Sequence, residues 1–485
     1  MKKFKKLYIL LAVAAIGATS CSKSFLDEKP PTADPVADAI KTENDMADAV
    51  NGMNNSMRSV NSFGATIPVL GDLLADNAYI STSNSGYWKS EQDYSFTAST
   101  TDVTSPYGQC YYTILQANRI IYYGKNLPQT NNVLELLGEA YATRALNYLT
   151  LVNLYATPYT ATGGSSALGV PLVTAPTNIT GPFNLPARAT VGTIYNKIIS
   201  DLDSAYAIMP VASTTLHAIS PVYMSKYAAK AIEARAYLYK GDYANARDAA
   251  LVVVQNGGYS LTTAANLSAY WATPSPAAGS KVESIFELEN NLATNNGTSG
   301  VDYYYNQNGY GQNLIYSDLY NQYTATDARK GLLISGTKAG NPAIILNKYS
   351  NTTNATDKDN VKIIRYAEVL LTLAEGYASA PTPDLVNALV YLNMVAKNRD
   401  PSFIGYTSTP TTIVSDILNE RRKELVGEGL RLADLNRLGL TINRPAQVGI
   451  YSTLQVIPTT NSKRLLPIPQ AEIDANKSTV QNPGY

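Results

Sequence analysis

Residues 225–258 read SKYAAKAIEARAYLYKGDYANARDAALVVVQNGG, and this stretch constrains the fold more than any other part of the chain. Small and apolar residues recur at helical spacing through Ala229, Ile232 and Ala236, and the pattern resumes at Ala246. The segment KGDYANA supplies a tight turn between the two runs, and the glycines at 257–258 end the second one. Small residues at the crossing positions let helices approach closely. The stretch therefore predicts two antiparallel helices that pack as a pair.

Six further segments show the same spacing, which makes eight predicted helices with this pair. The predicted helices span about 36–61, 106–126, 133–156, 190–209, 221–240, 243–256, 361–380 and 383–398. Helix pairs with small crossing residues are the pattern of a tetratricopeptide repeat, and such pairs must stack because none buries its apolar face alone. The sequence therefore predicts a mainly α fold, with a tetratricopeptide-repeat-like scaffold of about four helix pairs.

Two stretches, 62–104 and 258–360, lack this pattern. They are rich in Ser, Thr, Asn and Gly, and the second contains short β-like runs such as ESIFELE and AIILNKY. We expect a smaller irregular subdomain with some α/β character there. Binding residues concentrate on loops that a rigid scaffold holds, so these stretches are also the predicted ligand face.

The N-terminus predicts export and lipid anchoring. Residues 1–20 combine four lysines with an apolar run that is too short for a membrane-spanning helix, as in a signal peptide. Small residues lead into Cys21, which is the predicted lipidation site, and the polar residues 21–35 read as a tether. The alternative is an ordinary secretory signal followed by an unmodified cysteine. The other cysteine, Cys110, lies in a helical pattern and is expected in the core.

Composition excludes several classes of function. Lys plus Arg equals Asp plus Glu at 38 each, so no net field attracts nucleic acid. With one histidine, His217, and two cysteines, the chain supports neither a histidine-based triad nor a Cys/His zinc site. No cofactor or metal site is predicted. The segment 356–360, TDKDN, lacks the glycine and distal glutamate of an EF-hand and reads as a solvated turn.

Aromatic and amide side chains in the two irregular stretches are the candidate ligand residues. Tyrosine is abundant, at 36 against 7 Phe and 2 Trp, and its ring joins an apolar face to a hydrogen-bonding tip. A sugar needs flat rings for its C–H face and amides for its hydroxyls. The first candidate loop holds Asn84, Tyr87 and Trp88; for Trp88, packing of the loop against the helices is an equal alternative.

The second candidate loop follows residue 300 and carries three consecutive tyrosines. In an extended run Tyr303 and Tyr305 share one face while Tyr304 packs inward, so Tyr303, Tyr305 and Tyr310 are the predicted ligand residues. The remaining tryptophan, Trp271, is expected in the core.

The most charged window, 419–439, reads NERRKELVGEGLRLADLNRLG. Its Arg and Glu residues follow helical spacing, and the glycines at 427 and 429 interrupt the helix. Arginines such as Arg421 or Arg431 suit bidentate contacts between segments. We interpret this window as a structural brace.

Seven motifs follow one another along the chain: CSKSFLDEKP, GEAYATRALNYLTLVNLYATPY with GVPLV, ESIFELE, DLYNQYTATDAR, RYAEVLLTLAEGYA with LNMVAKNR, ERRKELVGEGLRLADLNRLG, and LLPIPQAEIDANKSTVQNPGY. In this order they resemble the SusD/RagB-like outer-membrane lipoproteins of glycan and peptide uptake. The resemblance implies a SusD-like domain over 36–485, with the scaffold at about 36–61, 105–257 and 361–400, ligand-face regions at 62–104 and 258–360, and a bracing segment at 401–485.

The resemblance further implies a surface-exposed outer-membrane lipoprotein, not an enzyme, that captures an oligosaccharide and delivers it to a SusC-like TonB-dependent transporter. A peptide-binding relative of the RagB kind is the first alternative. A secreted glycosidase on a helical scaffold and a purely structural repeat module are the others. The sugar and its linkage are not readable from the chain.

Overall fold

The computed structural model describes residues 39–176, 185–212, 214–217, 220–272, 283–291, 293–351 and 359–485. The predicted signal peptide, Cys21 and the tether lie outside the described residues, as does most of the segment 356–360. Among the described helices, none is both long enough and apolar enough to cross a membrane.

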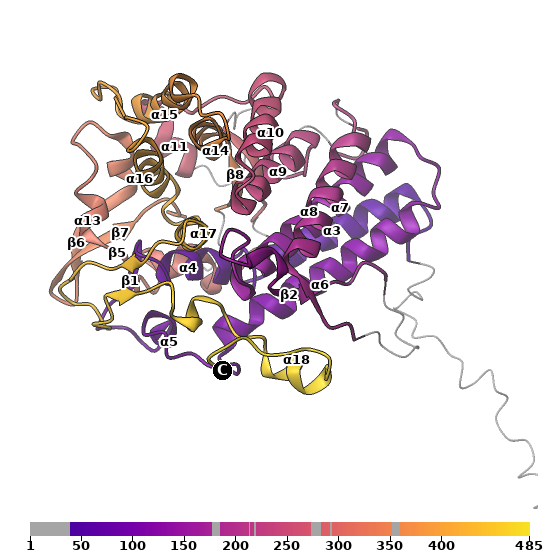
Figure 1. The fold of residues 1–485 in the computed structure, drawn as a ribbon, viewed down its shortest axis with the longest axis horizontal. Helices are drawn as coiled ribbons and strands as arrows, with labels where there is room; N and C mark the ends of the chain where they lie inside the picture. The colour runs from indigo at the N-terminus through magenta and orange to yellow at the C-terminus, as the bar shows by residue number, and fades with distance from the viewer. Residues whose placement is uncertain are drawn as a thin grey trace, which may run out of the picture.

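Within the described residues, eight long helices form one continuous array, and all eight predicted helices are confirmed. Neighbours pack in the order α3, α6, α7, α8, α9, α10, α14 and α15, so each helix lies beside the next (Figure 1). The bounds are α3 Glu43–Arg58, α6 Thr101–Gly124, α7 Asn131–Tyr155, α8 Val191–Ile208, α9 Lys226–Lys240, α10 Tyr243–Asn256, α14 Tyr366–Ser379 and α15 Leu385–Arg399. The mainly α, tetratricopeptide-like scaffold of four helix pairs is thus present.

Local chemistry fixes where these helices begin and turn. Thr42 caps α3 with a full capping box, and Ser225 caps α9 by accepting from the amide of Ala228. Between α9 and α10, Gly241 has a φ of 75°, which a residue with a Cβ rarely adopts, and Asp242 caps the next helix. The predicted turn in KGDYANA is therefore built from a left-handed glycine followed by an N-cap.

Small sheets and short helices make up the rest of the described chain, and the strands β1, β5, β6 and β7 lie at the left of Figure 1. In the part of the chain that the structure describes, a four-stranded antiparallel sheet has the order β1-β5-β7-β6, and three two-stranded sheets pair β2 with β3, β4 with β8, and β9 with β10. The strands are β1 Ala78–Ile80, β2 Leu168–Pro171, β3 Arg188–Thr190, β4 Ser284–Leu288, β5 Asn313–Ile315, β6 Leu333–Lys338, β7 Asn341–Leu346, β8 Val361–Arg365, β9 Ile442–Asn443 and β10 Val456–Ile457.

Short helices connect these strands and complete the C-terminal segment. They are α4 Thr66–Leu73, α5 Lys89–Gln92, α11 Leu267–Ala272, α12 Val301–Tyr305, α13 Ser317–Tyr320, α16 Ile413–Leu425, α17 Arg431–Arg437 and α18 Gln470–Ala475. Single turns of 3₁₀ helix lie at Gly164–Ser166, Ala264–Asn266, Gly297–Ser299, Ala328–Leu332 and Ser462–Arg464.

Two expectations about secondary structure were wrong. The stretch 62–104 contains α4, whose eight residues are all buried; a helix covered on every side has no polar face, so its sequence shows no amphipathic period. Residues 361–365, assigned to a helix, instead form β8 and pair with β4. The runs ESIFELE and AIILNKY do contain strands, β4 and β7. Trp271 and Cys110 are buried, as expected.

The charged window is a buried brace, as predicted. Arg365 and Arg399 both bind Glu283 at 2.6 Å and Glu424 at 2.9 and 3.0 Å, which joins β4, β8 and α15 to α16. Among the described residues, this buried ion-pair network includes Glu283, Asp327, Arg329, Lys348, Arg365, Arg399, Glu420, Glu424 and Glu428. Burial opposes charge, but the adjacent guanidinium groups hold the pKa of Glu424 well below its usual range.

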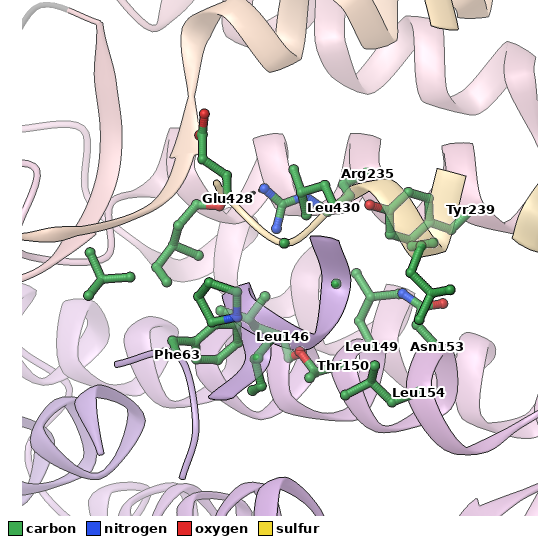
Figure 2. A pocket seen from close by; sticks show the side chains of 18 of the residues that line it. Phe63, Leu146, Leu149, Thr150, Asn153, Leu154, Arg235, Tyr239, Glu428 and Leu430 are labelled. Atoms are coloured by element: carbon green, nitrogen blue, oxygen red, sulfur yellow. Dashed lines mark hydrogen bonds between the residues drawn. The ribbon is translucent and has the colours of Figure 1, made fainter. Parts of the chain in front are cut away.

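The connection between α16 and α17 lies directly on α4. A Cβ on Gly71 would fall 1.9 Å from the carbonyl oxygen of Gly429, so only glycine fits at this contact. Figure 2 shows the cavity of about 70 Å³ that remains here, with Leu146 and Leu149 of α7 on one side and Leu430 on the other. Its lining includes none of the predicted ligand residues, and we regard it as a packing defect of the brace.

Candidate ligand-binding surface

The two candidate loops meet in space because β1 pairs antiparallel with β5. Ala78 lies opposite Ile315, and Ile80 lies opposite Asn313. The first loop leaves the end of β1, and the second loop runs into the start of β5. Antiparallel pairing places these two ends side by side, so residues more than 200 positions apart form one surface.

Four tyrosines from the two loops touch one another, and we call Tyr87, Tyr303, Tyr304 and Tyr310 the tyrosine cluster. The ring of Tyr87 lies 5.0 Å from that of Tyr310 and 5.7 Å from that of Tyr304, measured between centroids. Tyr310 also contacts Tyr303 at 6.0 Å and Tyr304 at 5.7 Å. Tyr87 is 37% exposed, and the other three are partly buried. The cluster is therefore a supported group of rings that reaches solvent.

Trp88 does not belong to the exposed part of this surface, which corrects one of the predicted ligand residues. It is only 2% exposed and meets the ring of Tyr304 edge-on, with centroids 5.3 Å apart. Its φ of 61° turns the chain into α5 and directs the side chain inward. Of the two roles open for Trp88, the structure supports packing: the indole holds Tyr304 from below.

Tyr305 is likewise buried and cannot offer its ring to a ligand in this conformation. The error comes from the period assumed for the three tyrosines. Residues 301–305 form the short helix α12, and in a helix neighbours are separated by about 100° of rotation, so alternate residues do not share a face. Tyr303 and Tyr304 are the partly exposed pair, and Tyr304 is the one that sequence reasoning had placed inside.

Asn84 shapes the first loop through both ends of its amide. Its Nδ2 donates to the carbonyl oxygen of Tyr87 at 2.8 Å, and its Oδ1 accepts from the amide of Gly86 at 2.5 Å. The side chain of Gln312 donates to Ser85 Oγ at 2.5 Å and joins the two loops. These amides hold Tyr87 in place, so we assign Asn84 to positioning.

One residue that sequence reasoning missed, Tyr451, extends the surface beside Lys89 of the first loop. Tyr451 is 40% exposed, and the ammonium group of Lys89 lies 5.0 Å from the centre of its ring. Tyr451 reaches this place because its amide donates to the carbonyl oxygen of Ile80, at the edge of the sheet. The segment 401–485, predicted only as a brace, therefore also supplies a surface aromatic; no signal short of the fold could have shown it.

The tyrosine cluster offers uncharged phenol hydroxyls and aromatic rings to a ligand. Contact with Tyr310 raises the pKa of Tyr87, and burial raises that of Tyr304, so both phenols keep their protons at physiological pH. Burial raises the pKa of Glu91 to about 7, but this carboxyl is enclosed beneath the loop and does not face a ligand on the exposed rings. The arrangement suits stacking and hydrogen bonding.

Arginines of the C-terminal brace bind the segment that precedes β1. Arg431 binds both carboxylate oxygens of Asp76, at 2.7 and 2.9 Å, two residues before β1. Arg422 donates to the carbonyl oxygen of Asp76 at 2.5 Å, and Arg444 donates to those of Leu73 and Ala75 at 2.7 and 2.9 Å. The bidentate role predicted for an arginine such as Arg431 is confirmed, and its effect is to fix the start of the strand that carries the first loop.

Comparisons with known proteins identify the family that has this helical repeat array. Residues 24–238 match a family model described as starch-binding and associating with the outer membrane, and residues 335–485 match the SusD family model. The chain belongs to the SusD/RagB-like family.

Relatives match the chain along its length. SusD-like protein P2 of Formosa agariphila is 25% identical over 539 residues, which cover 100% of both chains. A SusD superfamily protein from Bacteroides vulgatus has a TM-score of 0.83 at 28% identity, covering 92% of this chain and 100% of that one. One from Bacteroides thetaiotaomicron has a TM-score of 0.81 at 29% identity, covering 91% and 100%.

Proposed function

We propose that this protein binds oligosaccharides at the cell surface through the tyrosine cluster and delivers them to a SusC-like TonB-dependent transporter. The observation that carries the proposal is the meeting of Tyr87, Tyr303, Tyr304 and Tyr310 on one partly exposed surface. A family model described as starch-binding matches the part of the chain that contains Tyr87. Delivery draws its energy from the transporter, so the proposal is binding without catalysis.

The physical basis is the match between the cluster and a sugar ring. Exposed tyrosine faces cover the C–H side of a pyranose, and their hydroxyls exchange hydrogen bonds with its hydroxyls. Few rings are exposed, so modest affinity is expected; a millimolar dissociation constant corresponds to about −4 kcal/mol. Rings already supported by Trp88 lose little freedom on binding, which favours the bound state.

The anchor at Cys21 and the transporter complete the proposal. The family model describes association with the outer membrane, and residues 1–35 have the pattern of a lipoprotein signal and tether. A Cys21→Ala chain should therefore leave the membrane fraction, while the unaltered chain should stay there and co-purify with a TonB-dependent transporter. Equal membrane retention of both chains would contradict lipidation at Cys21.

The direct test of binding is affinity electrophoresis in gels that contain a panel of polysaccharides. We expect the unaltered protein to be retarded by at least one polysaccharide, and the triple variant Tyr87→Ala, Tyr303→Ala, Tyr310→Ala to migrate freely. Tyr112→Ala is the matched control, since Tyr112 is a 54% exposed tyrosine on α6, outside the cluster. Retardation of the triple variant equal to that of the control would refute the site.

The same experiment separates the alternatives. The cluster also suits a peptide, so isothermal titration with mixed peptides runs beside the gels; peptide binding alone would favour the RagB-like alternative. Release of reducing ends from any polysaccharide would contradict binding without catalysis and favour a glycosidase.

A further inference from the structure

A second group of chemically active side chains lies away from the tyrosine cluster, where α7 meets the connection between α8 and α9. Glu135 and Glu139 stand one turn apart on α7, and His217 comes from the connection. One ligand atom from each residue lies within 4.8 Å of the other two. His217 is the chain's one histidine, and it meets the two glutamates only through the fold.

Neighbouring groups orient the histidine. The amide of His217 donates to Thr214 Oγ1 at 3.1 Å, and the amide of Thr214 donates to the carbonyl oxygen of His217 at 3.0 Å, which forms a tight turn. The imidazole stacks on Tyr223, with ring centres 3.9 Å apart and planes 13° apart. Its Nδ1 lies 2.5 Å from Glu139 Oε1. The ring is thus held in one place and directed at the carboxylates.

The two carboxylates of this group, Glu135 and Glu139, have no lysine or arginine within 4 Å among the described residues. The ion-pair partner of Glu139 is His217. Glu139 is fully buried, and Oε2 of Glu135 is buried without a hydrogen-bond partner. A buried carboxylate oxygen without a partner is costly, so this arrangement favours an added cation.

We propose that Glu135, Glu139 and His217 together bind one divalent metal ion of the Zn²⁺ type. Two carboxylates balance its charge, and a neutral imidazole supplies nitrogen, which suits Zn²⁺ better than Ca²⁺ or Mg²⁺, whose protein ligands are oxygens. Zinc lies roughly 2.0–2.2 Å from nitrogen and oxygen ligands. Loading therefore moves Nδ1 and Oε1 apart by about 1 Å as the ion replaces their hydrogen bond.

The surroundings give the ion a route and a structural role. Glu135 lines a cavity of about 370 Å³, together with Val211, Tyr223 and Met224, so the site is reached from this cavity. The amide of Met224 lies 3.4 Å from Glu139 Oε2 and orients that carboxylate. A bound ion would tie the connection between α8 and α9 to α7, and thereby stabilise the middle of the helical array.

The test uses the mature protein without a histidine tag, dialysed against a chelator and titrated with ZnCl₂ by calorimetry. We expect one Zn²⁺ per chain, a rise in Tm on loading, and a Co²⁺ absorption band in the visible range. Glu135→Gln should weaken Zn²⁺ binding at least tenfold, and His217→Gln should abolish the Co²⁺ band. Asp203→Asn, a carboxyl-to-amide change at an exposed position of α8, is the matched control and should bind as the unaltered chain does.

Each outcome decides the proposal. If the unaltered protein shows no saturable one-to-one Zn²⁺ binding, the proposed metal site is wrong, whether or not the variants fold. The three residues would then form only a buried His–Glu ion pair. Tighter binding of Ca²⁺ than of Zn²⁺ would overturn the choice of metal. Glu135→Gln lies at the cavity wall and keeps the side-chain volume, so undiminished binding by this variant would show that the ion sits elsewhere.

Discussion

Replacement of Trp88 by alanine tests the central claim about the tyrosine cluster, that its buried indole supports the exposed rings. The side chain is 2% exposed and contacts Tyr304 at 5.3 Å. Truncation of a buried aromatic residue to alanine typically costs 3–5 kcal/mol, so we expect about 4 kcal/mol here. The left-handed backbone at φ 61° is unfavourable for Trp and Ala alike, so it contributes little to the difference in unfolding free energy between the variant and the unaltered protein.

The matched variant is Tyr87→Ala in the same loop. Its ring is 37% exposed, so we expect a loss of stability below about 1 kcal/mol, with a clear loss of polysaccharide retardation. Thus the main effect of Trp88→Ala is on the free energy of unfolding, and it affects binding only through Tyr304. The main effect of Tyr87→Ala is on binding. If the ring of Trp88 instead contacted the ligand, Trp88→Ala would weaken binding while leaving the free energy of unfolding nearly unchanged.

Urea unfolding followed by circular dichroism measures the difference, because fluorescence would change with the loss of one of the two tryptophans. Thermal scans are less sensitive: at roughly 2.1 cal/mol/K per residue, a chain of 485 residues loses only about 4 °C for 4 kcal/mol. If Trp88→Ala unfolds within 1 kcal/mol of the unaltered protein and has lost binding, the packing role of Trp88 is wrong and its ring contacts the ligand.

Three further predictions concern the brace and the core. Arg431→Met should lower the free energy of unfolding in urea by about 3–5 kcal/mol, because it leaves Asp76 buried without its bidentate partner. Adding Asp76→Asn should recover part of this loss, and no recovery would argue against the ion pair. The free energy of unfolding should fall as the pH drops below about 4, because carboxylates such as Glu424 have a lower pKa in the folded than in the unfolded chain. The stability that they add is present above the unfolded-state pKa and is lost as the pH falls through the folded-state pKa. Acid titration followed by circular dichroism checks this, and a loss of stability that begins near pH 7 would contradict it. In a Cys21→Ser chain, Cys110 should resist a thiol reagent at pH 8 until urea is added, because burial raises the pKa of its thiol to about 12. Rapid labelling of the native chain would show that α6 opens.

The helical array was predictable because its information is local. Periodic apolar positions, N-caps such as Ser225 and the turn at Gly241 all lie within one or two helical turns of what they specify. The same reasoning failed where burial is uniform, as in α4, or where an element is too short for its period to show, as in α12. In both cases the surroundings, which the local sequence does not describe, decide the conformation.

The sites depended more on contacts between distant residues. The sequence identified both candidate loops by composition, and Tyr87, Tyr303 and Tyr310 remain the residues proposed to contact ligand. It did not show which rings face solvent, since Trp88 and Tyr305 have the same chemistry as their exposed neighbours but lie inward. The group of Glu135, Glu139 and His217 was also invisible, because 78 positions separate the histidine from Glu139.

Spacing along the chain is enough to predict the helix pairs, the family motifs and the role of the charged window at 419–439. The contacts between distant residues follow from the fold: the pairing of β1 with β5 brings the two loops together, and Arg431 on α17 binds Asp76 across the molecule. Spacing fixes which face of a helix a residue occupies. What that face meets depends on the packing of elements hundreds of residues apart, and in this protein that packing makes the proposed binding surface.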